Sequence, residues 1–200
     1  MAMSCFTHFE NPGRRLPGAR SRPPATLLVC LALWGGPIAA RGAEAPEEPS
    51  LEYRVKAAFL MNFPKFVQWP PTAFPSDQSP IPVCTLGDDV FGAALDQMVA
   101  GESANGRKLV VQRLQNLPVP KSCRVLFVNL EEKARARALG ELDPGVLTVG
   151  EGDRFLREGG MIAFVVENRR VRFDINQTAA ENAGLRMSSQ LLKVARVVEK

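Results

Sequence analysis

The sequence predicts an α/β fold: a single three-layer domain whose mainly parallel sheet is flanked by helices, with an antiparallel hairpin near the C-terminus. Short apolar runs typical of buried strands alternate along the chain with segments whose apolar residues recur at helical spacing. Near the C-terminus, two strand-like runs follow each other with only a short polar turn between them. Because strands that alternate with helices usually pair in parallel, we expect helices on both faces of the sheet.

The first predicted element is a long helix in the stretch LEYRVKAAFLMNFPKFVQW, which Ser50 can cap. Pro64 should kink this helix near residues 60–63, because a proline removes a helical hydrogen bond and clashes with the preceding turn. The stretch carries fewer basic residues than a membrane-surface helix, so we expect it to pack on the core. Its predicted core stripe has three- and four-residue spacing and consists of Val55, Phe59, Phe63, Phe66 and Val67.

The elements that follow alternate regularly between strands and helices. Strands are predicted at residues 81–87, 107–114, 123–130 and 145–152, and two more strands form the hairpin within residues 161–176. Helices are predicted at residues 88–101, 131–142 and 177–184, and a last helix follows the cap residue Ser188.

The second strand of the hairpin has one apolar face. Its apolar residues are Val171, Phe173 and Ile175, and they alternate with Arg172, Asp174 and Asn176. The hairpin should form an antiparallel edge of the sheet. An exposed edge strand can pair with another chain, so a homodimer is possible.

Residues 1–43 have the features of a signal peptide. Arg20 and Arg22 form a basic region, residues 25–34 (ATLLVCLALW) form an apolar core, and small residues follow. This core is shorter than the roughly 20 residues that span a bilayer. We expect export to the periplasm with cleavage near residues 40–43, an uncleaved N-terminal anchor being the alternative. Residues 44–50 then form a short tether, and residues 51–200 form the folded domain.

The net charge of +4 does not indicate nucleic-acid binding. Five of the 25 basic residues and one of the 21 acidic residues precede Glu44, which leaves 20 of each in the rest of the chain. A nucleic-acid-binding domain would carry a basic excess instead.

The predicted mature chain keeps two cysteines, Cys84 and Cys123, and no histidine, since His8 lies in the leader. In an oxidising compartment two such cysteines tend to form a disulfide. Cys84 lies in the first strand of the α/β run and Cys123 at the start of the third. These strands are neighbours in the common 2-1-3 order, so a disulfide is feasible. Two buried free thiols are the alternative.

The composition gives no catalytic constellation. Without histidine, the mature domain cannot build a Ser-His-Asp triad or a histidine-ligated metal site. We therefore expect no enzymatic activity, metal or cofactor. Acidic residues follow two of the strands, where open α/β sheets bind ligands. These residues, Asp88, Asp89, Glu151 and Asp153, could bind a small cationic or polar ligand, or could serve only as helix caps and a solvated rim.

Four segments in order resemble the YfiR family of periplasmic regulators: EYRVKAAFLMNFPKFVQWP, PVCTLGDD, CRVLFVNL, and VRFDIN followed by AGLRMSSQLLKVA. The resemblance covers nearly all of residues 51–198. It departs from the family pattern at Pro64, where the family helix usually continues, and in the absence of a second cysteine pair around the hairpin.

The resemblance implies a regulator that acts by contact. YfiR-like proteins bind and repress an inner-membrane diguanylate cyclase, which controls cyclic-di-GMP and biofilm growth, and an OmpA-like outer-membrane lipoprotein can sequester them. It also implies a partner-binding region at the hairpin and the segment after it, with Arg172, Asp174, Asn176, Ala180 and Leu185 as candidate contacts. A small-molecule sensor or carrier is the alternative function.

Overall fold

The computed structural model describes residues 49–200. The predicted signal peptide and most of the tether therefore lie outside the described residues. Within the described range, none of the helices has the length and apolar character needed to cross a bilayer.

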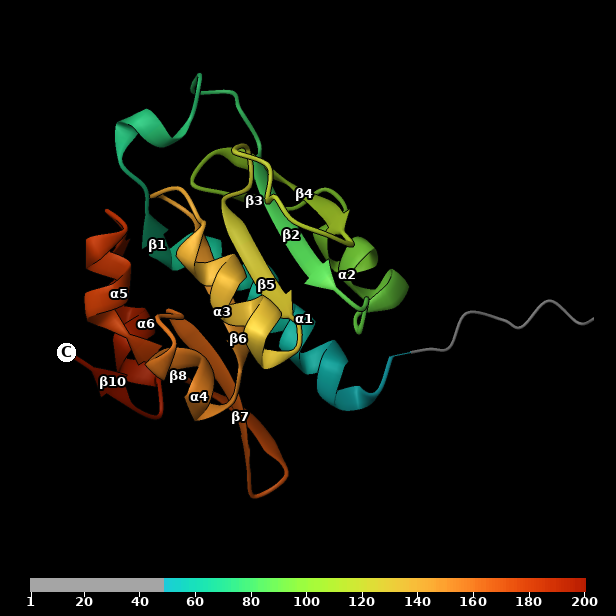
Figure 1. Ribbon diagram of the computed structural model, residues 1–200. Helices are drawn as coiled ribbons and strands as arrows, with labels where there is room; N and C mark the ends of the chain where they lie inside the picture. Colours follow the sequence, from blue (N-terminus) through green and yellow to red (C-terminus); the bar gives the residue numbers. More distant parts are fainter. Residues whose placement is uncertain (1–48) are drawn as a thin grey trace, which may run out of the picture. The chain divides into compact units, whose positions relative to one another are not determined.

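An eight-stranded sheet forms the centre of the domain, in the order β10-β8-β7-β6-β5-β2-β4-β3 (Figure 1). Its strands are β2 (Ile81–Gly87), β3 (Ser103–Ala104), β4 (Arg107–Leu114), β5 (Val125–Asn129), β6 (Leu147–Glu151), β7 (Ile162–Glu167), β8 (Arg170–Asn176) and β10 (Val198–Glu199). The pairings β4-β2, β2-β5, β5-β6 and β6-β7 are parallel, and β7-β8 is an antiparallel hairpin. The predicted fold class and the 2-1-3 order of the first strands are confirmed.

Helices cover both faces of this sheet. They are α1 (Leu51–Asn62), α2 (Gly92–Val99), α3 (Glu132–Gly140), α4 (Gly152–Arg157), α5 (Gln177–Asn182) and α6 (Ser189–Val194). One core cluster joins α1 and α2 to the face of the sheet that carries Val83 and Phe127. The other cluster joins α3 and α4 to the opposite face, which carries Leu86 and Leu126. Successive strand residues point to opposite faces, so β2, β5 and β7 contribute buried residues to both cores.

Short elements connect these layers. The 3-10 turns η1 (Phe63–Phe66) and η2 (Pro71–Ala73) follow α1, and β1 (Val67–Gln68) pairs with β9 (Arg186–Met187) in a separate two-stranded sheet. This small sheet ties the end of the α1 region to the C-terminal region. Neither β1 nor β9 was predicted, because two-residue strands have no periodicity to detect.

The first helix differs from the prediction in its end and in its buried face. It ends at Asn62, because Pro64 starts a 3-10 turn instead of kinking a longer helix. Its buried face is formed by Lys56, Ala57, Leu60 and Met61. Of the predicted stripe, Phe63 and Val67 are buried, Phe59 and Phe66 are half-buried, and Val55 is exposed. The helix is apolar on two sides, and the sequence does not reveal which side the sheet covers.

The hairpin strand β8 is not a fully open edge, which corrects the predicted topology. Strand β10 pairs with it in parallel through Ile175 and Asn176. This pairing was missed because β10 is only two residues long and comes from the C-terminal end of the chain. The backbone N–H of Ile175 also donates to the carbonyl of Val197, at 2.9 Å.

A disulfide joins Cys84 of β2 to Cys123, which lies just before β5. The two Cα atoms are 6.2 Å apart, within the range that a disulfide spans. Both side chains are fully buried in the core cluster on the α3–α4 side. The bond therefore links two neighbouring strands beneath a helix layer.

Gly160 should not tolerate alanine, whereas Gly140 should. A Cβ at Gly160 would lie 2.2 Å from the ring of Phe155, which is fully buried, whereas a Cβ at Gly140 would meet nothing. We expect Gly160→Ala to lower the free energy of unfolding by about 2 kcal/mol through overpacking. Gly140→Ala, at the last residue of α3, should leave it unchanged or raise it by up to about 1 kcal/mol. Urea denaturation of both variants measures the difference, and equal effects would contradict this packing.

Candidate functional site

The outer side of α1 and the β7–β8 hairpin together form an exposed apolar surface. Leu51 and Val55 of α1 are 76% and 37% exposed, and Val166 of β7 is 53% exposed. They line a shallow groove with the half-buried Phe59 and Val171. These five residues define the α1–hairpin surface. Contiguous exposed apolar residues of this kind mark interaction sites more often than scattered ones do.

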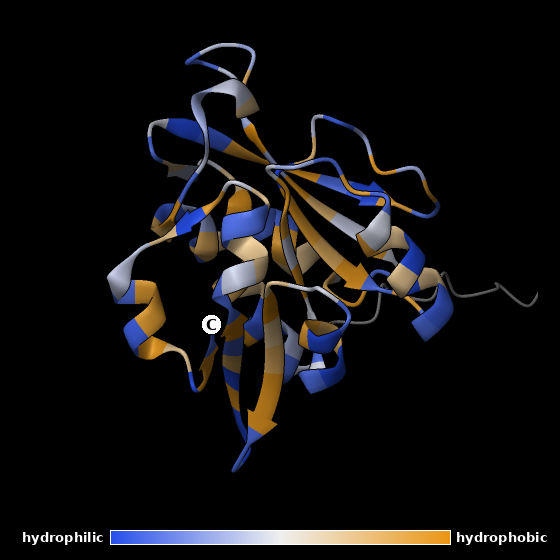
Figure 2. Ribbon diagram, turned by 60° about the vertical axis from the view of Figure 1, so that its left-hand side comes forward, coloured by the Kyte–Doolittle hydropathy of each residue, from blue (hydrophilic) through white to orange (hydrophobic). Residues whose placement is uncertain are grey.

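This surface includes three of the five large apolar side chains that are exposed in residues 49–200. A second shallow depression shares its α1 residues Leu51, Val55 and Phe59 with this groove and extends it to Ala58 and Met98. The hairpin projects beyond the rest of the sheet at the bottom of Figure 1, and in Figure 2 its strand β7 is mostly apolar, whereas apolar and polar residues alternate along β8. A partner could therefore reach this surface without a rearrangement of the core.

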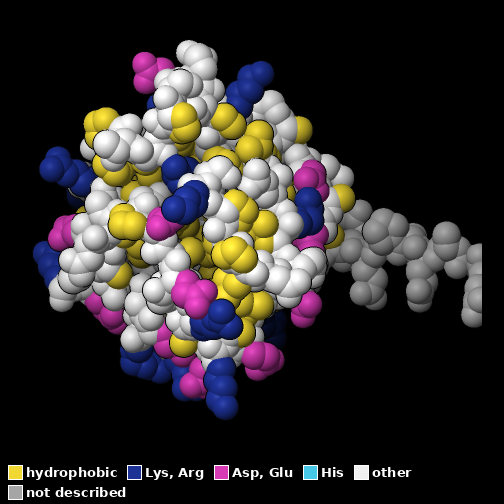
Figure 3. All heavy atoms as spheres, turned by 45° about the horizontal axis from the view of Figure 1, so that its top comes forward, with side chains coloured by type: hydrophobic (Ala, Val, Ile, Leu, Met, Phe, Trp, Pro, Cys, Tyr) yellow, Lys and Arg dark blue, Asp and Glu magenta, His cyan; other side chains and the backbone are white. Residues whose placement is uncertain are grey.

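Basic side chains border the α1–hairpin surface. Arg54 lies on α1, Arg169 and Arg170 line the groove at the hairpin turn and the start of β8, and Arg172 lies on the reverse face of β8, all of them exposed. None of these four arginines forms an ion pair with another residue of 49–200, whereas six other arginines of that range do. Acidic and basic side chains are interspersed on the face seen in Figure 3. The hairpin itself carries three of these four arginines, so it concentrates positive charge.

Lys56 anchors the inner side of α1 through a buried charge. Its ammonium group lies 2.5 Å from Glu52 and 3.0 Å from Glu151, at the end of β6. It also lies 4.5 Å from the centre of the Tyr53 ring. Burial alone would lower the pKa of Lys56, but the two carboxylates outweigh it and the pKa lies above its usual value. Lys56 therefore stays charged and holds the helix to the sheet end.

The acidic residues predicted at the strand ends have structural partners. Asp89 accepts hydrogen bonds from the backbone N–H groups of Phe91 and Gly92, at 3.1 and 3.0 Å, and pairs with Arg113 at 2.6 Å. Asp88 is exposed, and its backbone carbonyl, not its carboxylate, accepts a hydrogen bond from the Asn129 side chain.

The other acidic pair lies beside different partners. Glu151 binds Lys56, and Asp153 lies 3.5 Å from Arg196. The structure therefore does not bring the two pairs onto one shared partner. Of the four side chains only that of Asp89 caps backbone N–H groups, whereas Glu151 begins α4 without a side-chain cap hydrogen bond. No group of histidine, cysteine and acidic residues suited to a metal ion occurs in residues 49–200.

The residues predicted to contact a partner lie mostly in the interior, which corrects that prediction. Ala180 and Leu185 are fully buried, and Asp174 is 3% exposed. Asn176 caps α5 by accepting a hydrogen bond from the backbone N–H of Ala179, at 2.8 Å. Arg172 alone of the five is exposed. The alternation in β8 was interpreted correctly, but α4 and the C-terminal segment cover the side that was expected to face solvent, where Asn176 donates to the carbonyl of Leu156 and Asp174 binds Arg196.

Asp174 instead holds the C-terminal segment in place. Its carboxylate accepts two hydrogen bonds from the guanidinium of Arg196 and one from the backbone N–H of Val197, the latter at 3.1 Å. Arg196 also lies 3.7 Å from Glu167. The hydrogen bonds to Asp174 raise the pKa of Arg196 by more than desolvation lowers it. Arg196 therefore stays charged at any physiological pH. This contact fastens β10 to β8.

Residues 53–196 match the sequence model of the YfiR/HmsC-like family. The chain belongs to this family. YfiR/HmsC-like proteins are periplasmic and regulatory, not catalytic. The match includes α1 from Tyr53 onward and the hairpin, so all of the α1–hairpin surface except Leu51 lies within the matched residues.

No curated protein sequence matches this YfiR/HmsC-like chain. Among solved structures, it is similar to a conserved domain protein from Vibrio cholerae O1 biovar El Tor, with 12% sequence identity and a TM-score of 0.43. The alignment covers 76% of this chain and 62% of that structure.

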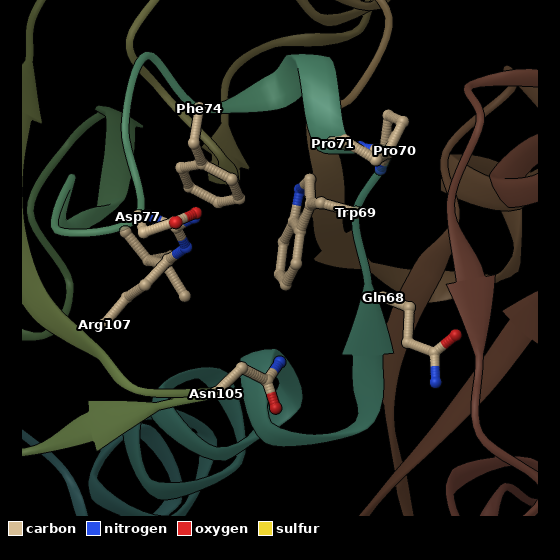
Figure 4. Close-up of a pocket in the computed structure, with 9 residues that line it drawn as sticks. Gln68, Trp69, Pro70, Pro71, Phe74, Asp77, Asn105 and Arg107 are labelled. Atoms are coloured by element: carbon tan, nitrogen blue, oxygen red, sulfur yellow. The ribbon is translucent and has the colours of Figure 1, made fainter.

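A cavity of about 290 Å³ lies at the other end of the YfiR/HmsC-like domain, between Trp69, Phe74 and Arg107 (Figure 4). Its polar side chains mostly bind the chain's own carbonyls. Trp69 Nε1 donates to Gly145 at 2.9 Å, and Arg107 donates to Ser76 and Ser79. The Arg107 guanidinium lies 4.0 Å from the centre of the Phe74 ring. The cavity therefore offers mainly apolar surface to a ligand.

The α1–hairpin surface was not predicted from the sequence, because the apolar spacing of Val55 and Phe59 is also that of a core stripe. One signal was available. Ala57, Leu60 and Met61 form a second apolar stripe on the same helix, and a sheet can cover only one of the two. A helix with two apolar sides is either enclosed on both or presents one to a partner.

Proposed function

We propose that this chain is an exported periplasmic regulator that binds an inner-membrane signalling protein and holds it inactive. The target that we propose is a diguanylate cyclase. Its release would then raise cyclic-di-GMP and promote biofilm formation. An OmpA-like outer-membrane lipoprotein is the proposed competitor that sequesters it. Family membership supports the regulatory class, and the proposal needs no cofactor.

The α1–hairpin surface is the observation that carries the proposal. A regulator without chemistry of its own must recognise its target by contact, and contact energy comes mainly from apolar groups that leave water. Val55 and Val166 lie within this surface and are accessible in the folded protein. The arginines around it supply orientation and faster association with an acidic target.

Glutamate at Val55 and Val166 should abolish target binding without unfolding the domain. Both side chains are exposed, so the double variant should keep the free energy of unfolding within about 1 kcal/mol. Two buried charges at the interface should weaken binding by a hundredfold or more, on the order of 3 kcal/mol. The measurement is co-purification of the membrane target with the tagged protein, together with cellular cyclic-di-GMP.

Val194→Glu provides the matched control. Val194 is 61% exposed on α6 and does not line the α1–hairpin groove. This variant should capture the target as well as the original protein does. If the double variant at Val55 and Val166 still represses and still co-purifies, the surface is not the binding site.

Small-molecule sensing is the second candidate function, and the cavity beside Trp69 is the observation that favours it. Its volume is near the lower end of ligand pockets. Trp69 is the single tryptophan of the predicted mature chain, so its fluorescence reports directly on occupancy of this cavity. Titration with periplasmic metabolites distinguishes this candidate from regulation by protein contact alone.

A further inference from the structure

We propose that the outer edge of β8 at Arg170–Arg172 accepts an extended segment of the target in which apolar and acidic residues alternate. This rests on the proposed function and specifies the partner's chemistry. Three features of the hairpin carry it: a partly open strand edge, the two different faces of that strand, and the charge along it.

The first feature is the incomplete cover of β8. Its inner edge pairs with β7 along its whole length, from Glu167↔Arg170 to Ile162↔Ile175. On the outer edge β10 pairs only with Ile175 and Asn176, and Arg196 donates its N–H to the carbonyl of Phe173. Within residues 49–200, no strand pairs with Arg170–Arg172 from that side.

The backbone alternation identifies which groups point outward. Asn176 donates to the carbonyl of Met161 on the β7 side, whereas Ile175 and Phe173 bond to the C-terminal segment. Inward and outward bonding alternate along an antiparallel pair. The N–H and C=O of Val171 therefore face the open edge, where an added strand would bind them as in other cases of strand addition.

The second feature is the difference between the two faces of β8 at this point. Val171 pairs with Val166 and lines the groove with Val55 and Phe59 on the α1 side. Arg170 and Arg172 occupy the alternate positions of the strand and therefore lie on the opposite face, and Arg170, next to the turn, also reaches the rim of the groove. An added strand would place every second side chain beside the apolar groove and the intervening ones beside the two arginines. Its sequence should therefore alternate apolar and acidic residues.

The third feature, the positive charge, selects an acidic partner over a second copy of this chain. Two copies joined by this edge would bring Arg170 and Arg172 of one copy near those of the other, and facing like charges destabilise a sheet. Basic residues on an edge strand also block promiscuous pairing. This edge therefore disfavours pairing with a second copy of itself and favours a partner strand that carries carboxylates.

The test uses two blocked seven-residue peptides, one alternating valine with glutamate and one alternating valine with lysine. The purified protein should bind the glutamate peptide and not the lysine peptide in calorimetry at low salt. Hydrogen exchange should show new protection of the Val171 amide on binding. The double variant Arg170→Glu/Arg172→Glu should bind the glutamate peptide at least about tenfold more weakly, because attractive cross-strand pairs become repulsive. It should gain binding to the lysine peptide.

Arg157→Glu/Arg186→Glu is the charge-matched control, since both arginines lie outside β8, and it should keep binding to the glutamate peptide. Equal binding of both peptides, or peptide binding without protection of Val171, would overturn the proposal. The membrane target separates this from the proposed function. If the Arg170→Glu/Arg172→Glu variant still captures the target fully while Val55→Glu/Val166→Glu does not, the regulator stands and the strand-addition mode is wrong. If neither double variant captures the target, the result supports both the regulator function and the strand-addition mode.

Discussion

Reduction of the Cys84–Cys123 disulfide should lower the melting temperature by about 10 °C. The bond closes a loop with a sequence separation of 39 residues. In the chain-entropy account, releasing such a loop costs about 4 kcal/mol of stability. For a domain of this size, each kcal/mol corresponds to about 2–4 °C. Because both sulfurs are buried in the core under α3 and α4, the loss should also loosen the contact between β2 and β5.

Calorimetric melts with and without reductant measure this effect. The Cys84→Ala/Cys123→Ala variant should have nearly the melting temperature of the reduced protein, and reductant should not change it. This control separates the effect of losing the disulfide from other effects of the reductant. Mass spectrometry of alkylated native protein gives the redox state directly. Two alkylatable thiols in the unreduced native protein, or an unchanged melt, would show that the bond does not contribute.

Lysine at Asp174 should destabilise the domain by about 3 kcal/mol and free its C-terminal strand. The substitution removes the acceptor for Arg196 and for the Val197 N–H, and it places an ammonium group beside a guanidinium at a site that is 3% exposed. Leaving a buried charge without its partner is among the most costly single changes. The expected loss of stability is at the lower end for such changes, because the Arg196 side chain is 31% exposed and water screens part of the repulsion.

Urea denaturation measures the stability of this variant, and hydrogen exchange at the Ile175 amide, which donates to Val197, measures the release of the strand. Arg172→Glu reverses a charge two residues away at an exposed position and should change stability by less than about 0.5 kcal/mol. A stable Asp174→Lys variant with unchanged protection at Ile175 would show that the contact with Arg196 is dispensable. The comparison also shows whether loss of repression by an Asp174 variant reflects unfolding or lost contact.

The sequence by itself determined the fold class and the positions of the main strands, whereas for the two cysteines it left both a disulfide and free thiols open. The fold class and the strands depend on interactions that are local or that recur along the chain. Strand and helix periodicities lie in the order of the residues, and the 2-1-3 order follows from the short connections of an α/β fold. The caps at Ser50 and Ser188 were predicted for the same reason, since a cap bonds within three residues of itself.

Only the tertiary structure decided which side of α1 is buried and where β8 is covered. The helix has apolar residues on both sides, and the choice between Ala57 with Leu60 and Val55 with Phe59 depends on how α1 lies on the sheet. Asp174 looked like a solvent-facing residue in the strand pattern. It is buried because Arg196, 22 residues later, returns to pair with it. Such contacts join parts of the chain that no local pattern connects, so only the folded chain shows which apolar side of α1 stays exposed beside the hairpin.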